Sequence, residues 1–113
     1  MPKYKVDNGV LYSGSKQLGN SEDIIVDGHQ DIVEYIKRSG REKVSVAQLP
    51  EGDYVMVTPS GLTVGIEEKK SGDLATSLRN RRLQRQLRRL EDAVDIPLLG
   101  LRFGYRESFT PEW

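Results

Sequence analysis

The chain has 113 residues, with 17 basic and 17 acidic side chains and no cysteine. This length is typical of a single compact domain, so we predict one domain over residues 1–113. The lack of cysteine excludes disulfides, thiolate zinc sites and cysteine nucleophiles. A net charge of zero argues against a histone-like binder. No apolar run reaches the roughly 18 residues of a membrane span, so we predict no membrane contact. The N-terminus has no apolar signal segment, so we predict a cytoplasmic protein. The small size indicates a prokaryotic, viral or phage setting.

The N-terminal segment carries a hairpin signal. Residues 3–13 alternate apolar and polar side chains around Asn8 and Gly9. This dipeptide favours a type I′ turn, which joins two antiparallel strands. Residues 13–21 are rich in glycine and serine and predict a loop.

Strand patterns dominate the middle of the chain. Residues 23–27, 43–49 and 53–58 have the apolar runs or alternation of strands, and a fourth strand begins at Leu62. Residues 30–39 instead carry apolar side chains at helical spacing and predict a helix.

After Gly72 the apolar period lengthens from two residues to about 3.6, which is typical of a helix. We expect either one broken helix or two short ones, with a single buried face. That face is predicted to contain Leu78, Leu83, Leu87 and Leu90. Residues 97–103 then form an apolar run of buried-strand character. The predicted order is β-α-β-β-β-α-β behind an N-terminal hairpin, an α/β domain whose mixed central sheet is covered by helices.

The stretch from residue 52 to residue 73 brings acids and a lysine together. Strand alternation puts Glu67 and Lys69 on one face, about 7 Å apart, with Asp53 on the neighbouring strand. Two carboxylates can hold Mg²⁺ or Mn²⁺, which acidifies a water and neutralises a phosphoryl group. Lys69 is suited to orienting that water and stabilising the hydroxide it becomes. Asp27, at the end of an adjacent strand, is a further candidate metal ligand.

An acid and a lysine on a strand are also common at a solvated sheet edge. The register is ambiguous as well, since Glu68 and Lys70 form a second pair with the same spacing. Glu68 shares its parity with the apolar face of that strand. We therefore predict that Glu67 and Lys69 are the functional pair.

Further residues continue this pattern in a fixed order. The segment GDY at 52–54 is followed by GIEEKKSGDLATSL and then by RRLQRQL. The pattern resembles the nuclease domain of the XPF-type (ERCC-family) structure-specific endonucleases. Their signature is G-D-Y or G-D-F, E-R-K-x-x-x-D-L, S-L, an R-L pair and a glutamine on the next helix. The matching positions are Asp53, Glu67, Lys69, Asp73, Leu74, Ser77, Leu78, Arg82, Leu83 and Gln86. The resemblance covers residues 23–103, leaving residues 1–20 as the hairpin and loop and residues 104–113 as a tail.

This resemblance implies a PD-(D/E)xK nuclease with a restriction-endonuclease-like core. It implies Mg²⁺- or Mn²⁺-dependent hydrolysis of DNA near branches such as 3′ flaps and junctions. Asp53 and Glu67 would be metal ligands, Lys69 the catalytic lysine and Asp27 an additional acidic member. We expect Asp73 to cap the following helix, because aspartate is a favoured N-cap residue.

The chain departs from the family pattern at two places. Glu68 stands where the family has arginine, so any ionic partner of that arginine is lost or reversed. His29 and Gln30 stand where the family has arginine and glutamate, which puts a second metal position in doubt. We also expect the chain to lack the family's tandem helix-hairpin-helix domain, because 113 residues leave no room for it.

Six arginines and no acid lie between residues 79 and 89. They are either a solvated helix face or phosphate contacts, and we favour phosphate because arginine binds it bidentately. The predicted DNA-binding residues are Arg79, Arg82, Arg85 and Gln86. Pairing of two copies, or with another subunit, is expected through leucines of the last helix and the tail.

Two alternatives to a DNA endonuclease stay open. One is a non-catalytic DNA-binding subunit that keeps the nuclease fold. The other is a nuclease that acts on single-stranded nucleic acid or on RNA.

Overall fold

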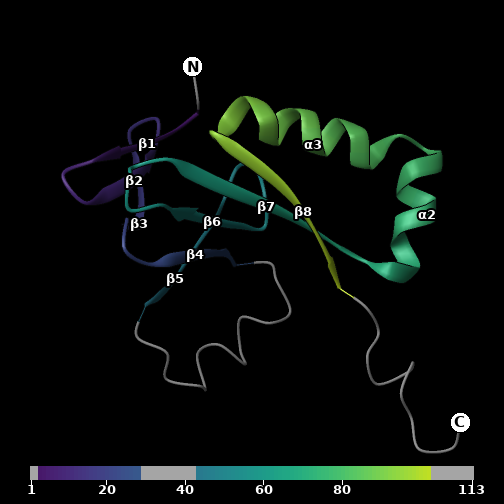
Figure 1. Ribbon diagram of the computed structural model, residues 1–113, viewed down its shortest axis with the longest axis horizontal. Helices are drawn as coiled ribbons and strands as arrows, with labels where there is room; N and C mark the ends of the chain where they lie inside the picture. The colour runs from purple at the N-terminus through teal and green to yellow at the C-terminus, as the bar shows by residue number, and fades with distance from the viewer. Residues whose placement is uncertain (1–2, 29–42, 103–113) are drawn as a thin grey trace, which may run out of the picture.

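The computed structural model describes residues 3–28 and 43–102, which form two sheets and two helices (Figure 1). The N-terminal sheet has the order β1-β2-β3. Its strands are β1 (Tyr4–Asp7), β2 (Val10–Ser13) and β3 (Lys16–Asn20). Asn8 and Gly9 both have positive φ, 52° and 78°, as a type I′ turn requires, so the hairpin prediction is confirmed.

The prediction of a loop over residues 13–21 is wrong, because β3 occupies most of it. Gly14, with φ of 60°, lets the chain reverse tightly after β2. Ser13 then pairs with Lys16, and Leu18 is buried against the core. The neighbours of Leu18 in the sequence are polar or glycine, so the sequence shows no strand pattern, although burial of Leu18 stabilises the strand.

The central sheet is mixed, as predicted, with the order β5-β4-β6-β7-β8. Its strands are β4 (Ile24–Asp27), β5 (Val44–Ala47), β6 (Tyr54–Val57), β7 (Thr63–Lys70) and β8 (Ile96–Arg102). β4 pairs with β5 in parallel and with β6 antiparallel. β7 pairs antiparallel with β6 and in parallel with β8. The helix predicted over residues 30–39 lies outside the described residues.

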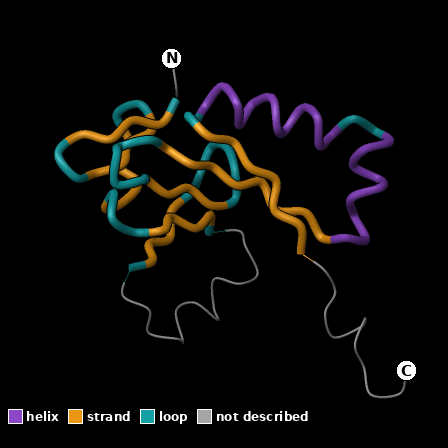
Figure 2. The backbone as a smooth tube through the Cα atoms, in the orientation of Figure 1, coloured by secondary structure: helices purple, strands orange, loops and turns teal. Residues whose placement is uncertain are grey.

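Two helices, α2 (Ser71–Arg79) and α3 (Arg82–Ala93), connect β7 to β8. α3 runs along one side of these strands, and α2 turns away beyond the end of β7 (Figures 1 and 2). The break falls at Asn80 and Arg81. The backbone of Arg81 is left-handed, with φ of 60°, and the side chain of Asn80 accepts the N–H of Arg82 at 3.0 Å.

One core unites both sheets and α3. Its buried members are Tyr4, Leu11, Leu18, Ile25, Leu49, Val55, Leu90, Ala93 and Val94. A Cβ on Gly65 would lie 2.7 Å from Leu90 and 2.9 Å from Val94, so the absence of a side chain lets α3 approach β7 closely. The same observation identifies the face of β7 that α3 covers, which contains the odd-numbered residues.

Two burial predictions are wrong. Leu78 is 46% exposed, because it belongs to α2, whose described neighbours do not cover it. Residues 97–103 were expected to form a buried strand, yet Leu98, Leu99 and Leu101 are each more than 40% exposed. Among the described strands, β8 lies at one edge of the sheet, next to β7. Within residues 3–28 and 43–102, no helix is long and apolar enough to cross a membrane.

Candidate active site

The predicted acids lie in one row across three adjacent strands. Val26 pairs with Tyr54, and Tyr54 pairs with Ile66. The next step along these strands places Asp27 beside Asp53, and Asp53 beside Glu67. The backbone bond from Asp27 N–H to Asp53 O at 2.9 Å fits the first of these steps. The bond from Asp53 N–H to Ile66 O at 2.8 Å is shifted by one residue from the second step, so the strand is irregular at Asp53. The charge of Asp53 raises the pKa of Glu67, so the two carboxylates are nevertheless close.

This row shares a face with the core. The preceding row on the same face is Ile25, Val55 and Gly65, against which Leu90 and Val94 pack. Directly opposed residues of antiparallel strands project to the same side. The acids therefore begin where the apolar core ends, on the side of the sheet that α3 covers.

Asp53 is held in place by the next strand. Its Oδ2 accepts the backbone N–H of Glu68 at 2.7 Å. Burial raises the pKa of Asp53, and the negative charges of Glu68 and Asp27 add to the rise. The hydrogen bond from Glu68 and the charge of Lys69 act in the opposite direction. The carboxylate is thus fixed in position while its negative charge is only partly compensated.

Glu67 is a buried acid whose pKa is strongly raised. Only 7% of the residue is exposed. Burial raises its pKa from 4.5 to about 7, with a further rise from the charge of Asp53 and an opposing effect of Lys69. A buried acid next to a second acid is a common arrangement at functional sites.

Lys69 lies beside Glu67 on the same face of β7. Its Nζ is 3.9 Å from Oε1 of Glu67, and the two side chains are only 12% and 9% exposed. The structure therefore brings together Asp53, Glu67 and Lys69 as the strand alternation predicts. An ammonium held this far from water can stabilise negative charge that develops near it.

Asp27 occupies the row, but its carboxylate has another partner. Oδ1 of Asp27 accepts the N–H of Leu49 at 3.1 Å, which ties the end of β4 to the loop after β5. Within the described ranges, no three acids or histidines are close enough together to hold a metal ion. A role of Asp27 as a metal ligand stays a prediction.

The capping role expected of Asp73 is wrong. α2 begins three residues earlier than predicted, at Ser71, and its N-cap position is Lys70, without a side-chain cap. Asp73 instead lies exposed in the first turn, where its negative charge complements the helix dipole.

The predicted DNA-binding residues divide between the surface and the interior. Arg79, Arg82 and Arg85 are exposed. Gln86 is partly covered, and its Oε1 is buried without a hydrogen-bond partner in the described structure. Gln86 lies one turn before Leu90, which packs on Gly65, so it is on the side of α3 that faces β7. Buried acceptors without a partner are rare, and here the acceptor belongs to a helix that covers the acids.

Two charged residues near the site were missed. The charge of Glu51 raises the pKa of Glu67, and the charge of Arg89 lowers it. Glu51 forms ion pairs with Lys3 at 3.6 Å and with Arg89 at 3.4 Å. The hydroxyl of Tyr4 accepts the N–H of Glu51 at 3.0 Å and donates to its carbonyl. Only its position before Gly52 and Asp53 could have indicated Glu51 from the sequence.

The site residues fit a divalent cation of the Mg²⁺ or Mn²⁺ type. Asp53 and Glu67 are neighbouring carboxylates, each with a pKa raised partly by other negative charge. A cation between them would relieve that repulsion. The orphaned amide oxygen of Gln86 is a third oxygen donor on the same side of the sheet. Oxygen donors of these kinds are the ligands that such cations take.

Comparison with known proteins agrees with this geometry. Residues 23–109 match the family model of the ERCC4 domain. The fold is similar to XPF from Aeropyrum pernix, with a TM-score of 0.54 and 32% sequence identity. That match takes in 70% of this chain and 39% of the chain from Aeropyrum pernix. No curated protein matches the sequence.

The chain is therefore an α/β protein with a restriction-endonuclease-like sheet. It belongs to the ERCC4 domain family, and its domain is of the XPF nuclease type.

Proposed function

We propose that this chain is a Mg²⁺- or Mn²⁺-dependent endonuclease that cuts DNA at branches or flaps. One observation supports the proposal most: Asp53, Glu67 and Lys69 lie close together beside α3, in a chain of the ERCC4 family. The chain from Aeropyrum pernix is more than twice as long as the matched part. The activity is therefore proposed from the site of this chain and its domain family.

Each residue has a chemical role in this proposal. Asp53 and Glu67 would bind the cation, which would supply an acidified water and neutralise phosphate charge. Lys69 opposes the rise in the pKa of Glu67 and stabilises the negative charge of the attacking oxygen. Arg79, Arg82 and Arg85 hold phosphates of the strand, without reading its sequence.

The main competing function is a DNA-binding subunit that does not cut. Two observations favour it. The described residues contain no cluster of three metal-binding side chains, and His29 and Gln30 replace residues of the family pattern. The buried Glu67 and the half-buried Asp53 and Lys69 argue against it, since removing these charges from water costs stability without a benefit to a subunit that only binds.

Pairing with a second subunit remains part of the proposal, but Leu83 and Leu90 of the last helix no longer belong to its expected surface. Leu83 and Leu90 of α3 are buried in the core of this chain, so they cannot also form a contact between subunits. The mass of the protein in solution, measured by light scattering at tens of micromolar, tests pairing directly. A monomer would contradict it.

Cleavage assays distinguish these functions. Labelled flap, junction, duplex and single-stranded DNA, and single-stranded RNA, are incubated with Mg²⁺, Mn²⁺ or EDTA. We expect cleavage of branched DNA that EDTA abolishes. Lys69→Ala should reduce the single-turnover rate about 100-fold or more, whereas the matched control Lys70→Ala should keep it. Cleavage in EDTA would overturn the mechanism, and tight binding without cleavage would favour the non-cutting subunit.

A further inference from the structure

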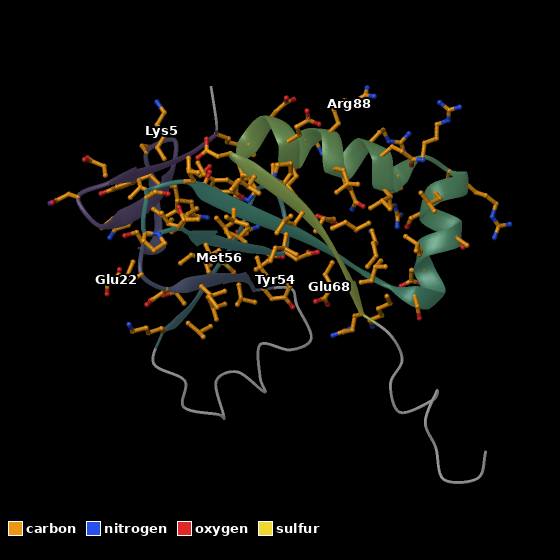
Figure 3. All side chains as sticks on the ribbon, in the orientation of Figure 1. Lys5, Glu22, Tyr54, Met56, Glu68 and Arg88 are labelled. Atoms are coloured by element: carbon orange, nitrogen blue, oxygen red, sulfur yellow. The ribbon has the colours of Figure 1, made fainter. Side chains whose placement is uncertain are left out.

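Glu68, which replaces the arginine of the family pattern, has specific partners on the side of the sheet away from α3. Its Oε2 accepts the hydroxyl of Tyr54 on β6 at 3.1 Å. Its Oε1 lies 3.5 Å from Nε of Arg102 on β8. The side chains of Glu68 and Arg102 are 20% and 33% exposed, so the pair is partly shielded from water. Figure 3 shows Tyr54 and Glu68 on the side of the sheet opposite Arg88 of α3.

The side chain of Glu68 links β7 to both β6 and β8. At this position, the backbone pairing links β7 only to β8. The last pair of the β6–β7 ladder is Tyr54 with Ile66. Asp53, which precedes Tyr54, still donates its N–H to Ile66 O at 2.8 Å, and before it Gly52 has a positive φ of 82°. The β7–β8 ladder continues, with Glu68 paired to Gly100. Beyond Ile66, contact between β7 and the β6 segment therefore depends on side chains.

The backbone N–H of Glu68 lies in that unladdered part and binds Oδ2 of Asp53 at 2.7 Å. A hydrogen bond from an amide to a carboxylate is short and strong, but it holds only while the two segments keep their spacing. The side chain of Glu68, bound to Tyr54 on one side and Arg102 on the other, maintains that spacing from the opposite face.

We propose that Glu68 is a positioning residue: its bridge to Tyr54 and Arg102 holds its own N–H on Asp53 and thereby fixes that carboxylate beside Glu67. The negative charge at position 68 is then matched by the positive charge of Arg102 on the next strand. The inference rests on the proposed function in one respect: the bridge preforms a cation site only if Asp53 and Glu67 bind a cation. The bridge itself is a property of the protein without metal or DNA.

The test is the amide of Glu68, followed by NMR in metal-free buffer. In the unmodified protein we expect a downfield, slowly exchanging amide proton. Asp53→Asn should move this proton upfield and so identify the bond. Glu68→Arg and Arg102→Glu should each reduce its protection about tenfold or more, through local opening. The charge swap Glu68→Arg with Arg102→Glu should restore much of the protection.

Two further variants keep the test decisive. Tyr54→Phe removes one hydroxyl without changing volume, and it should reduce the protection of the Glu68 amide while most other amides are unaffected. Glu91→Arg makes the same charge change at an exposed position of α3 and should leave the Glu68 amide as it is. Protection that survives Glu68→Arg and Tyr54→Phe would overturn the proposal, as would a folded charge swap without recovery.

Mn²⁺ titrations of the same proteins separate this inference from the proposed function. If the bridge positions Asp53, affinity should fall in Glu68→Arg and recover in the charge swap. If no protein in the series binds Mn²⁺ or cuts DNA, the proposed function fails, while the amide data still decide whether the bridge holds Asp53.

Discussion

Glu67 is the residue whose burial has the clearest consequence for stability. Burial raises the pKa of Glu67 from its ordinary value of 4.5 to about 7. In the folded chain, Glu67 therefore keeps its proton at pH values well above 4.5. A folded-state pKa above the unfolded one means that this residue favours folding at low pH. That contribution is lost as the pH rises from about 4.5 through about 7.

Replacing Glu67 by glutamine should therefore stabilise the protein at pH 8 in EDTA. The expected gain in the free energy of unfolding is on the order of 1–3 kcal/mol, from about 1.4 kcal/mol per pKa unit. Denaturant unfolding at pH 5 and pH 8 measures it, with Glu91→Gln as an exposed control. A loss of stability at pH 8 in Glu67→Gln would contradict the raised pKa.

The residue types of the site were predictable, and its electrostatics were not. The alternation of β7 was enough to place Glu67 and Lys69 together, because strand parity does not depend on tertiary contacts. Asp53 followed from the neighbouring strand. The pKa shifts, and the effect of Glu51, depend on burial by α3 and on a distant ion pair. No local pattern records these.

At the scale of elements, α3 has two separate tasks. Leu83 and Leu90 bind the helix to the core, whereas Arg82, Arg85 and Arg88 are exposed. Figure 3 shows Arg88 extending from α3 away from the sheet. The helix therefore offers positive charge to a ligand without losing its packing.

Removing two of these arginines should weaken DNA binding in a salt-dependent way. For Arg82→Ala with Arg85→Ala, the slope of log affinity against log salt should fall by up to about two. Anisotropy titrations with labelled flap DNA at several salt concentrations measure this slope. Lys5→Ala with Lys16→Ala, in the N-terminal sheet, is the matched double control and should change it less. Equal slopes in the α3 variant and the unmodified protein would show that Arg82 and Arg85 are solvated surface.

Elements that are determined by a few neighbouring residues were predicted correctly. Elements whose burial depends on other strands and helices of the fold were not. The turn at Asn8 and Gly9 is determined by two positive φ values, which the sequence indicates directly. β3 was missed because only Leu18 of its five residues is apolar and buried. β8 was predicted as buried from its composition, although a strand's place at the edge of a sheet depends on the whole topology.

At the scale of the molecule, the N-terminal sheet lies before the family match but shares its core. Tyr4, Leu11 and Leu18 belong to the same cluster as Leu90 and Val94 of the matched segment. The hydroxyl of Tyr4 also binds the backbone of Glu51, next to the site. We expect the sheet to fold and unfold with the nuclease core, consistent with a single domain.

Leu11→Ala tests this expectation. Leu11 is fully buried, so the substitution should lower the free energy of unfolding by about 2–5 kcal/mol in one cooperative transition. Leu62→Ala, at a residue that is 44% exposed, should cost much less. Denaturant unfolding followed by circular dichroism measures both. A separate early transition in Leu11→Ala would mean that the N-terminal sheet folds independently.

The central claim is that Asp53 and Glu67 form a divalent-cation site, and calorimetric titration with Mn²⁺ tests it most directly. At pH 8 the unmodified protein should bind Mn²⁺, and Glu67→Gln should bind it more than about tenfold more weakly. Glu91→Gln should bind it as the unmodified protein does. Equal affinity in Glu67→Gln and the unmodified protein, or no binding by either, would contradict the claim.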